Sequence, residues 1–153
     1  KFINITSAED MYQAVVSNLD ENDVVIKSAA VADYKPKEYS DKKIKKKDGD
    51  LVIELDRNKD IAYEIGKIKK DKILVGFAAE TNDIIENAKG KIAKKNMDFI
   101  VANNLKESGA GFGTDTNVVS IIEKDGSMKK YPMMTKEEVA SVILDKIKEL
   151  LSV

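Results

Sequence analysis

Short apolar segments alternate along this chain with longer segments in which apolar residues recur every three or four positions. Apolar runs of about four to eight residues are typical of buried strands, and the longer period is typical of helices with one apolar face. Strands that alternate with amphipathic helices favour an α/β fold with a largely parallel sheet. The runs predicted as strands are FINI at 2–5, DVVIKS at 23–28, LVIELD at 51–56, KILVGFAAE at 72–80 and MDFIVANN at 97–104.

Polar residues that can cap a helix precede each amphipathic segment. The segment between the second and third predicted strands is polar and lysine-rich, and it is predicted to be a loop or flap. A Gly-rich loop is predicted at 105–116, and a hairpin is predicted around Asp125-Gly126. The predicted helices are 6–19 (capped by Thr6 or Ser7), 58–70 (Asn58 or Asp60), 81–96 (Thr81 or Asn82) and 135–151 (a capping box of Thr135 and Glu138).

The 153 residues fit a single domain. We predict a Rossmann-like three-layer sandwich, with a mostly parallel sheet and an antiparallel hairpin at one edge. Ligands of such sheets bind beyond the C-terminal ends of the strands. Polar or small turns follow three of the predicted strands, at 28–33, 77–81 and 102–104, so these turns should lie together on one edge.

The composition excludes several kinds of chemistry. The chain has no histidine and no cysteine, which rules out an imidazole base, a thiol nucleophile and a thiolate metal site. Lysine, carboxylates, asparagine, backbone amides and a hard cation such as Mg²⁺ remain, and these are groups that bind phosphates. The net charge of −1 does not favour nucleic acid as a partner, and no apolar run reaches the roughly 18 residues of a membrane span. We expect a cytoplasmic protein.

The first candidate site is the stretch SAAVAD at 28–33. Small side chains would let a ligand approach the backbone N–H groups, and Asp33 could accept a hydrogen bond from a ribose hydroxyl or bind Mg²⁺ through water. The alternative is a tightly packed strand end with Asp33 as a turn residue. Five lysines follow between 42 and 47; they could close over a phosphate or could be a solvated charge run.

Three further features have both a functional and a structural interpretation. Phe77 lies in a strand-to-helix turn, where it could stack on a base or pack in the core. Lys91 and Lys95 share a helix face, which could bind successive phosphates or could simply be exposed. Asn103 ends a strand, where it could orient a substrate or cap a turn.

The order of these motifs is more specific than any one of them. The series is SAAVADY at 28–34, KIKK at 43–46, N-x-DI at 58–61, GFAAET at 76–81, K-x-x-x-K at 91–95, DFIVAN at 98–103 and GFGTDTNVVSII at 111–122. It closely resembles phosphopantothenoylcysteine synthetase over essentially the whole chain. That family is the ligase half of a bifunctional coenzyme A biosynthesis protein, and its other half is a flavin-dependent phosphopantothenoylcysteine decarboxylase.

The resemblance implies a reaction and a set of roles. The family joins 4′-phosphopantothenate to L-cysteine; CTP, with Mg²⁺, activates the carboxylate as an acyl-cytidylate with release of pyrophosphate, and the cysteine amine then displaces CMP. Lys43 would be the flap lysine that acts during conversion of the intermediate. The family often has proline at the position of Lys59. The implied CTP-binding residues are Lys27, Ser28, Ala29, Ala30, Asp33, Lys59, Asp60, Ile61, Ala62, Phe77, Lys91 and Lys95.

The chain departs from the family pattern at its start. Family members carry an upstream strand and a turn of the type N-x-S-S-G, whose asparagine binds the acyl-cytidylate carbonyl. We therefore expect the 153-residue chain alone to be impaired or inactive in ligation. The resemblance also implies a homodimer, with LVIELD and the flap as the expected contact. The main alternative function is a non-catalytic module that binds CTP; a nicotinamide-dependent reductase and an RNA-binding protein are less favoured.

Overall fold

The computed structural model describes residues 1–45, 49–80, 84–104 and 114–151. A five-stranded sheet lies at the centre of the molecule, and two short two-stranded ladders lie outside it. The helices are α1 (Ala8–Asn18), α2 (Ile61–Ile68), α3 (Ile84–Lys95) and α4 (Lys136–Leu151). The strands are β1 (Val24–Lys27), β2 (Tyr34–Pro36), β3 (Leu55–Arg57), β4 (Ile73–Glu80), β5 (Phe99–Asn104), β6 (Thr116–Asn117), β7 (Val119–Glu123), β8 (Met128–Lys130) and β9 (Met134–Thr135).

The central sheet has the order β1-β4-β5-β7-β8. Strands β1, β4 and β5 are parallel, whereas β7 is antiparallel to both β5 and β8. Strand β8 therefore has the same direction as β1, β4 and β5. The β7–β8 hairpin turns at Asp125-Gly126, where Gly126 has a φ of 86° that favours glycine. The predicted mostly parallel sheet with an antiparallel hairpin at one edge is confirmed.

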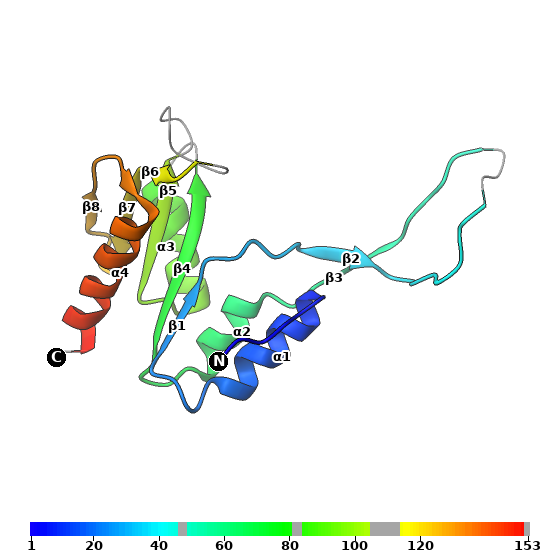
Figure 1. Ribbon diagram of the computed structural model, residues 1–153, viewed down its shortest axis with the longest axis horizontal. Helices are drawn as coiled ribbons and strands as arrows, with labels where there is room; N and C mark the ends of the chain where they lie inside the picture. Colours follow the sequence, from blue (N-terminus) through cyan, green and yellow to red (C-terminus); the bar gives the residue numbers. More distant parts are fainter. Residues whose placement is uncertain (46–48, 81–83, 105–113, 152–153) are drawn as a thin grey trace.

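Helices cover both faces of this sheet (Figure 1). Alternate residues of β4 face opposite layers, as strand geometry requires. Leu74 and Ala78 belong to a core cluster that includes residues of α2 and α3, with α1 packed against it. Ile73 and Val75 belong to a second cluster, which the buried side chains of α4 complete. The predicted three-layer sandwich is therefore confirmed.

Side-chain caps begin the helices where the sequence predicts them. Ser7 forms a capping box with Asp10 at α1, and Asp60 accepts a hydrogen bond from the Tyr63 N–H at α2. At the start of α4, Glu138 accepts from Thr135, and the Glu138 N–H donates back to the Thr135 hydroxyl. Each cap satisfies N–H groups that the first helical turn leaves free. The predicted caps of α3, at 81 and 82, lie outside the described residues.

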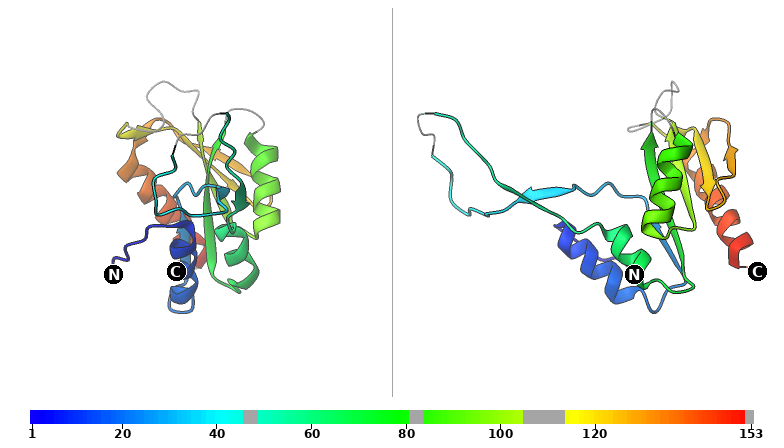
Figure 2. Two further views of the ribbon diagram at one scale, coloured as in Figure 1. Left: turned by 90° about the vertical axis from the view of Figure 1, so that its right-hand side faces the viewer. Right: turned by 180° about the vertical axis from the view of Figure 1, so that it is seen from behind.

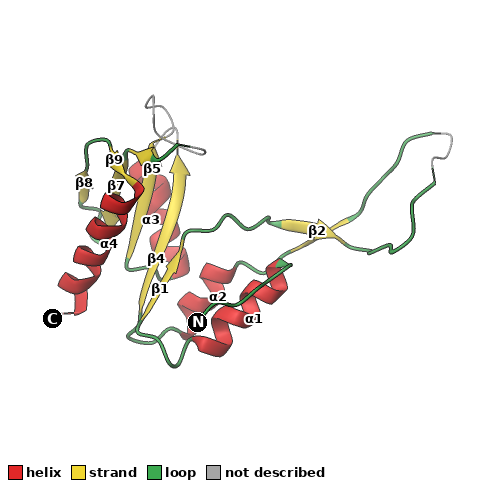
Figure 3. Cartoon of the chain, viewed as in Figure 1, coloured by secondary structure: helices red, strands yellow, loops and turns green. Residues whose placement is uncertain are grey.

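A long arm leaves the body between β1 and α2 (Figures 1 and 2). Its base is the antiparallel pair of β2 and β3, and most of its length is loop (Figure 3). The sequence prediction was wrong here in two respects, since β2 lies within the predicted loop and residues 51–54 of the predicted strand 51–56 form no strand. The apolar side chains of that stretch have no core beneath them; Val52 is 82% exposed.

The strand predicted at 2–5 was also wrong. These residues form no strand, and Phe2 is 88% exposed. A strand needs a hydrogen-bonded neighbour, and none of the described strands pairs with this segment. Apolar composition alone therefore gave a wrong prediction for a segment without a partner strand.

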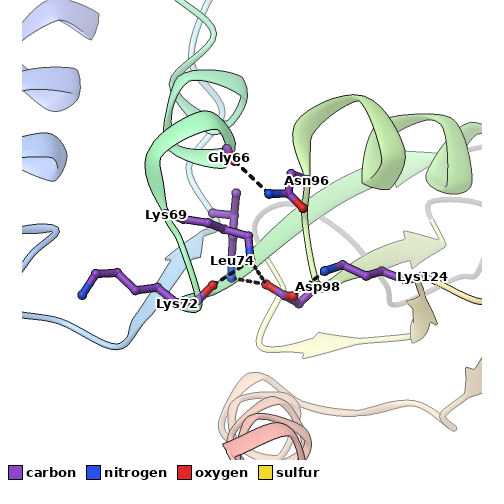
Figure 4. Close-up of polar contacts among 7 residues, drawn as sticks. All are labelled: Gly66, Lys69, Lys72, Leu74, Asn96, Asp98 and Lys124. Carbon is purple, nitrogen blue, oxygen red and sulfur yellow. Dashed lines mark hydrogen bonds and ion pairs between the residues drawn. The ribbon is translucent and has the colours of Figure 1, made fainter.

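At the N-terminal ends of β4 and β5, Asp98 is the centre of a polar network (Figure 4). One carboxylate oxygen accepts from Lys69 Nζ at 2.8 Å and from the Leu74 N–H at 2.7 Å, and the other accepts from Lys124 Nζ at 2.8 Å. Burial raises the pKa of Asp98, but the hydrogen bonds from Lys124, Lys69 and Leu74 outweigh it and hold that pKa below its ordinary value. The network ties α2, β4, β5 and the β7–β8 turn together.

Helices α2 and α3 approach each other closely beside this network. A Cβ atom on Gly66 would lie 1.9 Å from the carbonyl oxygen of Lys95, so only glycine fits there. Asn96, whose φ is 49°, donates from Nδ2 to the Gly66 carbonyl at 2.9 Å. The close approach brings the last turn of α3, which ends at Lys95, against α2. Within the described residues, no helix combines the length and apolar character needed to cross a membrane.

Candidate functional site

A cavity of about 310 Å³ lies beyond the C-terminal end of β1. The last rung between β1 and β4 joins Lys27 and Gly76, and β4 continues to Glu80 beside β5 alone. The chain turns away after β1, which leaves the last part of β4 uncovered on one side. The cavity is lined by Lys27, Ser28, Ala29, Ala30, Val31, Ala32, Asp33, Lys59, Asp60, Ile61, Phe77, Ala78, Ala79, Lys95 and Asn103.

The three turns predicted to share one edge contribute residues to this one cavity. The stretch 28–33 forms one wall, Phe77 and the two alanines after it come from β4, and Asn103 comes from β5. Parallel strands place their C-terminal ends together, which is the reason that the sequence could predict this grouping. A fourth contributor is the N-terminal end of α2, with Lys59, Asp60 and Ile61, which the family resemblance had implied.

Charged side chains of both signs meet in the cavity. Lys95 Nζ lies 2.9 Å from the Asp60 carboxylate, which also caps α2. Burial raises the pKa of Asp60, but hydrogen bonds from Lys95 and the Tyr63 N–H bring it below its ordinary value. Burial lowers the pKa of the Lys27 ammonium, and the charge of Lys95 lowers it further, whereas Asp60 and Asp33 oppose this shift. Two lysines crowded at a partly buried site favour an anionic ligand.

Two neutral groups in the cavity are available to a ligand. The side-chain oxygen Oδ1 of Asn103 is buried and has no hydrogen-bond partner within the described parts of the chain. A buried acceptor without a protein partner costs free energy, so this oxygen is open to a donor from a ligand or from water in the cavity. Phe77 is 37% exposed, which leaves part of its ring accessible for stacking.

Lys59 lines the cavity, but its ammonium group is engaged elsewhere. Lys59 Nζ lies 2.8 Å from Glu9 Oε1 and 4.3 Å from the centre of the Tyr12 ring, so it joins the start of α2 to α1. Sequence reasoning missed Glu9 and Tyr12 because their contact with Lys59 spans about fifty residues. Lys59 contributes mainly its stem and backbone to the cavity.

Three of the predicted site residues do not line the cavity. Lys43 lies on the arm, Lys91 lies on α3 one turn before Lys95, and Ala62 lies on the buried face of α2. Two lysines of the predicted flap, at 46 and 47, lie outside the described residues.

Sequence reasoning assigned Asn58 only to the start of a helix, whereas its side chain bonds to the 28–33 loop. Asp60 holds the cap position that was predicted for either residue. No local pattern indicates the role of Asn58, because the segment that it contacts is 26 residues away.

The carboxylates in the cavity do not form a closed metal site. Within the described parts of the chain, no group of three or more aspartates and glutamates is placed to hold a metal ion. Asp33 and Asp60 are the two carboxylates at the cavity. Such a pair fits Mg²⁺ that arrives with phosphates, because Mg²⁺ commonly keeps its waters and takes only one or two protein carboxylates.

Comparison with known proteins gives a consistent result. Residues 1–151 match the family model described as DNA/pantothenate metabolism flavoprotein C-terminal domain. The chain is 53% identical over 150 residues to the coenzyme A biosynthesis bifunctional protein CoaBC of Bacillus subtilis (strain 168). That match covers 98% of this chain but only 37% of the relative, so the chain spans little more than a third of its length.

Solved structures agree with the sequence comparison. The crystal structure of the C-terminal domain of a coenzyme A biosynthesis bifunctional protein CoaBC is 42% identical, with a TM-score of 0.79 over 98% of this chain and 67% of that one. A mutant of Cab2 in complex with phosphopantothenate-cysteine has a TM-score of 0.74 at 14% identity, over 98% of this chain and 53% of that one. At that identity the likeness concerns the fold alone.

Proposed function

Since the chain belongs to the family of the DNA/pantothenate metabolism flavoprotein C-terminal domain, we propose that it ligates 4′-phosphopantothenate with L-cysteine in coenzyme A biosynthesis. The observation that carries this proposal is the cavity at the end of β1, where lysines, small residues and an unpaired asparagine oxygen meet. The name of the Bacillus subtilis relative, a coenzyme A biosynthesis bifunctional protein, supports it.

The proposed reaction has two steps and uses CTP as co-substrate. The phosphopantothenate carboxylate attacks the α-phosphorus of CTP, which forms the acyl-cytidylate and releases pyrophosphate. The cysteine amine then attacks the acyl carbon, the new amide bond forms, and CMP leaves while the amine loses its proton. Neither step needs a thiol or an imidazole from the protein, which fits a chain without cysteine or histidine.

The residues at the cavity supply position and charge. Lys27 and Lys95 stabilise phosphate oxygens, and the small residues of 28–33 allow the nucleotide to contact the backbone. Phe77 stacks on the base or the ribose, and Asn103 Oδ1 accepts a hydrogen bond from the bound substrate. Mg²⁺, when bound, would offset the charge of the triphosphate, and Asp33 would hold it through water.

The arm suits a role in pairing two copies of the chain. Apolar side chains at Leu51, Val52 and Ile53 are all at least 60% exposed, which is unusual for a segment that stays in solvent. We expect them to pack against the partner in a homodimer, which would also bring Lys43 of the arm towards a cavity. We further expect a phosphopantothenoylcysteine decarboxylase to act beside this domain, and a cytoplasmic location.

The proposal is tested with a chimera in which this chain replaces the matching part of the Bacillus subtilis relative. We expect pyrophosphate release that requires CTP and phosphopantothenate, and CMP release that additionally requires cysteine. The parent protein is the positive control. A chimera that binds CTP yet releases neither product would instead support the non-catalytic binding module, which the position of Lys43 away from the cavity favours. A chimera that neither binds CTP nor turns over would contradict both.

A further inference from the structure

Asn58 lies where the arm joins the body, and two hydrogen bonds close the arm at this point. The Asn58 main-chain N–H donates to the Asp33 carbonyl at 2.8 Å, and its side-chain Nδ2 donates to the Ala32 carbonyl at 2.8 Å. The next rung outward is the β2–β3 pair of Tyr34 and Arg57. The side chain of Asn58 thus adds one more bond at the base of the ladder.

Both strands of this base lead directly into the cavity. Ala32 and Asp33 line the cavity on one side and Lys59 and Asp60 on the other, but Asn58 itself is not among the lining residues. We propose that Asn58 is a positioning residue, which fixes Asp33 against the N-terminal end of α2 and so couples the arm to ligand binding. The inference rests on the proposed function, in which Asp33 serves the nucleotide.

The side-chain bond of Asn58 adds to its main-chain bond and to the β2–β3 ladder outside it. Two bonds to adjacent carbonyls restrict rotation of the loop about the Asn58 backbone, as a bidentate contact does elsewhere. On the other side of the loop, Lys27 Nζ donates to the Ala29 carbonyl at 2.9 Å. Side chains therefore hold the 28–33 loop at both ends. They also offset the partial negative charge of the Ala29 and Ala32 carbonyls, which lie beside a cavity proposed for an anion.

Amide hydrogen exchange tests whether the clamp exists. Asn58→Ala removes the donor, and Asn58→Asp replaces it with an oxygen that repels the Ala32 carbonyl. We expect faster exchange in both variants at the amides of Tyr34 and Lys35 and at 55–58, with α4 unchanged. Asn22→Ala is the matched control, because Asn22 Nδ2 likewise donates to a main-chain carbonyl, that of Asn18 at the end of α1, at 2.6 Å. Exchange at the arm base equal to wild type would overturn the proposal.

A double-mutant cycle tests whether the clamp acts through Asp33. Asn58→Ala should weaken CTP binding by about 3- to 10-fold, the range that one net hydrogen bond gives. In the Asp33→Ala background the same change should cost less than about twofold, because the positioned group is gone. The same factor in both backgrounds, or wild-type affinity in Asn58→Ala, would contradict the positioning role.

The two tests separate this inference from the proposed function. If wild type bound no CTP, the proposed function would fail. Raised exchange at the arm base in Asn58→Ala would then still support the clamp, and unchanged exchange would overturn it.

Discussion

The two ends of the central strands use charged groups in opposite ways. At the N-terminal ends of β4 and β5, Asp98 is matched by two lysines and a backbone N–H. At the C-terminal ends, Lys27 and Lys95 crowd together, although Lys27 donates to the Ala29 carbonyl and Lys95 pairs with Asp60. The buried Oδ1 of Asn103 has no partner among the residues that the structure describes. The first end has its polar groups satisfied by the protein, whereas the second keeps one buried acceptor and two crowded lysines that a ligand can engage.

This difference separates stability from binding. A satisfied buried network stabilises the fold, and removal of one member leaves the others unpaired. An unsatisfied site costs stability but gives a ligand hydrogen bonds and charge that are already in position. Substitutions at the two ends should therefore change different measured quantities.

Asp98→Ala should have the largest effect on stability. It leaves Lys69, which is buried, and the Leu74 N–H without their acceptor, so we expect the free energy of unfolding to fall by about 3 kcal/mol. Urea denaturation measures this change. Lys124→Met is the comparison, because that lysine is exposed and its loss should cost less than about 1 kcal/mol. Equal losses in the two variants would contradict the central place of Asp98.

The pH dependence of stability should show the same carboxylate. The pKa of Asp98 is lowered in the folded state, so its contribution is present above the unfolded pKa of about 4 and is lost as pH falls through the folded value. We expect the urea midpoint of wild type to fall more steeply than that of Asp98→Asn as pH decreases below about 4. Parallel curves for the two proteins would assign the acid sensitivity to other groups.

Lys95→Met removes the ion pair with Asp60 and should cost less than about 1 kcal/mol of unfolding free energy. It should reduce CTP affinity about tenfold, the value of one charge-assisted hydrogen bond. Calorimetric titration in Mg²⁺ measures the affinity. Lys67→Met is the control, because Lys67 also pairs with an acidic side chain, Glu64, at 2.8 Å, but away from the cavity. If both variants bound CTP equally well, Lys95 would have no role in binding.

Asn96→Gly should have the smallest of these effects. Glycine accepts the positive φ of this position, so the substitution removes mainly the hydrogen bond to the Gly66 carbonyl. We expect a loss of about 1 kcal/mol in unfolding free energy. This bond affects the cavity only indirectly, by holding the end of α3 against α2. CTP affinity should therefore fall less than in Lys95→Met. A larger loss of affinity than of stability would mean that Asn96 belongs to the site itself.

Features that depend on neighbours in the sequence could be predicted. The caps of α1 and α4 follow from local pairs such as Ser7 with Asp10, and the parallel strands follow from apolar runs. The cavity could also be predicted, because parallel strands bring their C-terminal ends together whatever the details of packing.

Features that depend on distant contacts could not be predicted. Asp98 meets Lys69 across 29 residues and Asn58 meets Ala32 across 26, and no spacing rule connects such pairs. Residues 2–5 and 51–54 are as apolar as the true strands, but the described residues offer them no sheet to join. Strand prediction from apolar composition fails for an apolar segment that does not belong to the sheet.

The most direct test of the account compares Asn103→Ala with Asp98→Asn, by CTP titration (with ATP as control) and urea denaturation of the same samples. We predict that Asn103→Ala weakens CTP binding without lowering the free energy of unfolding, because its buried oxygen has no partner to lose among the described residues. Asp98→Asn should lower the free energy of unfolding and retain the affinity for CTP. Loss of stability without loss of CTP affinity in Asn103→Ala would contradict the assignment of the C-terminal end to the ligand.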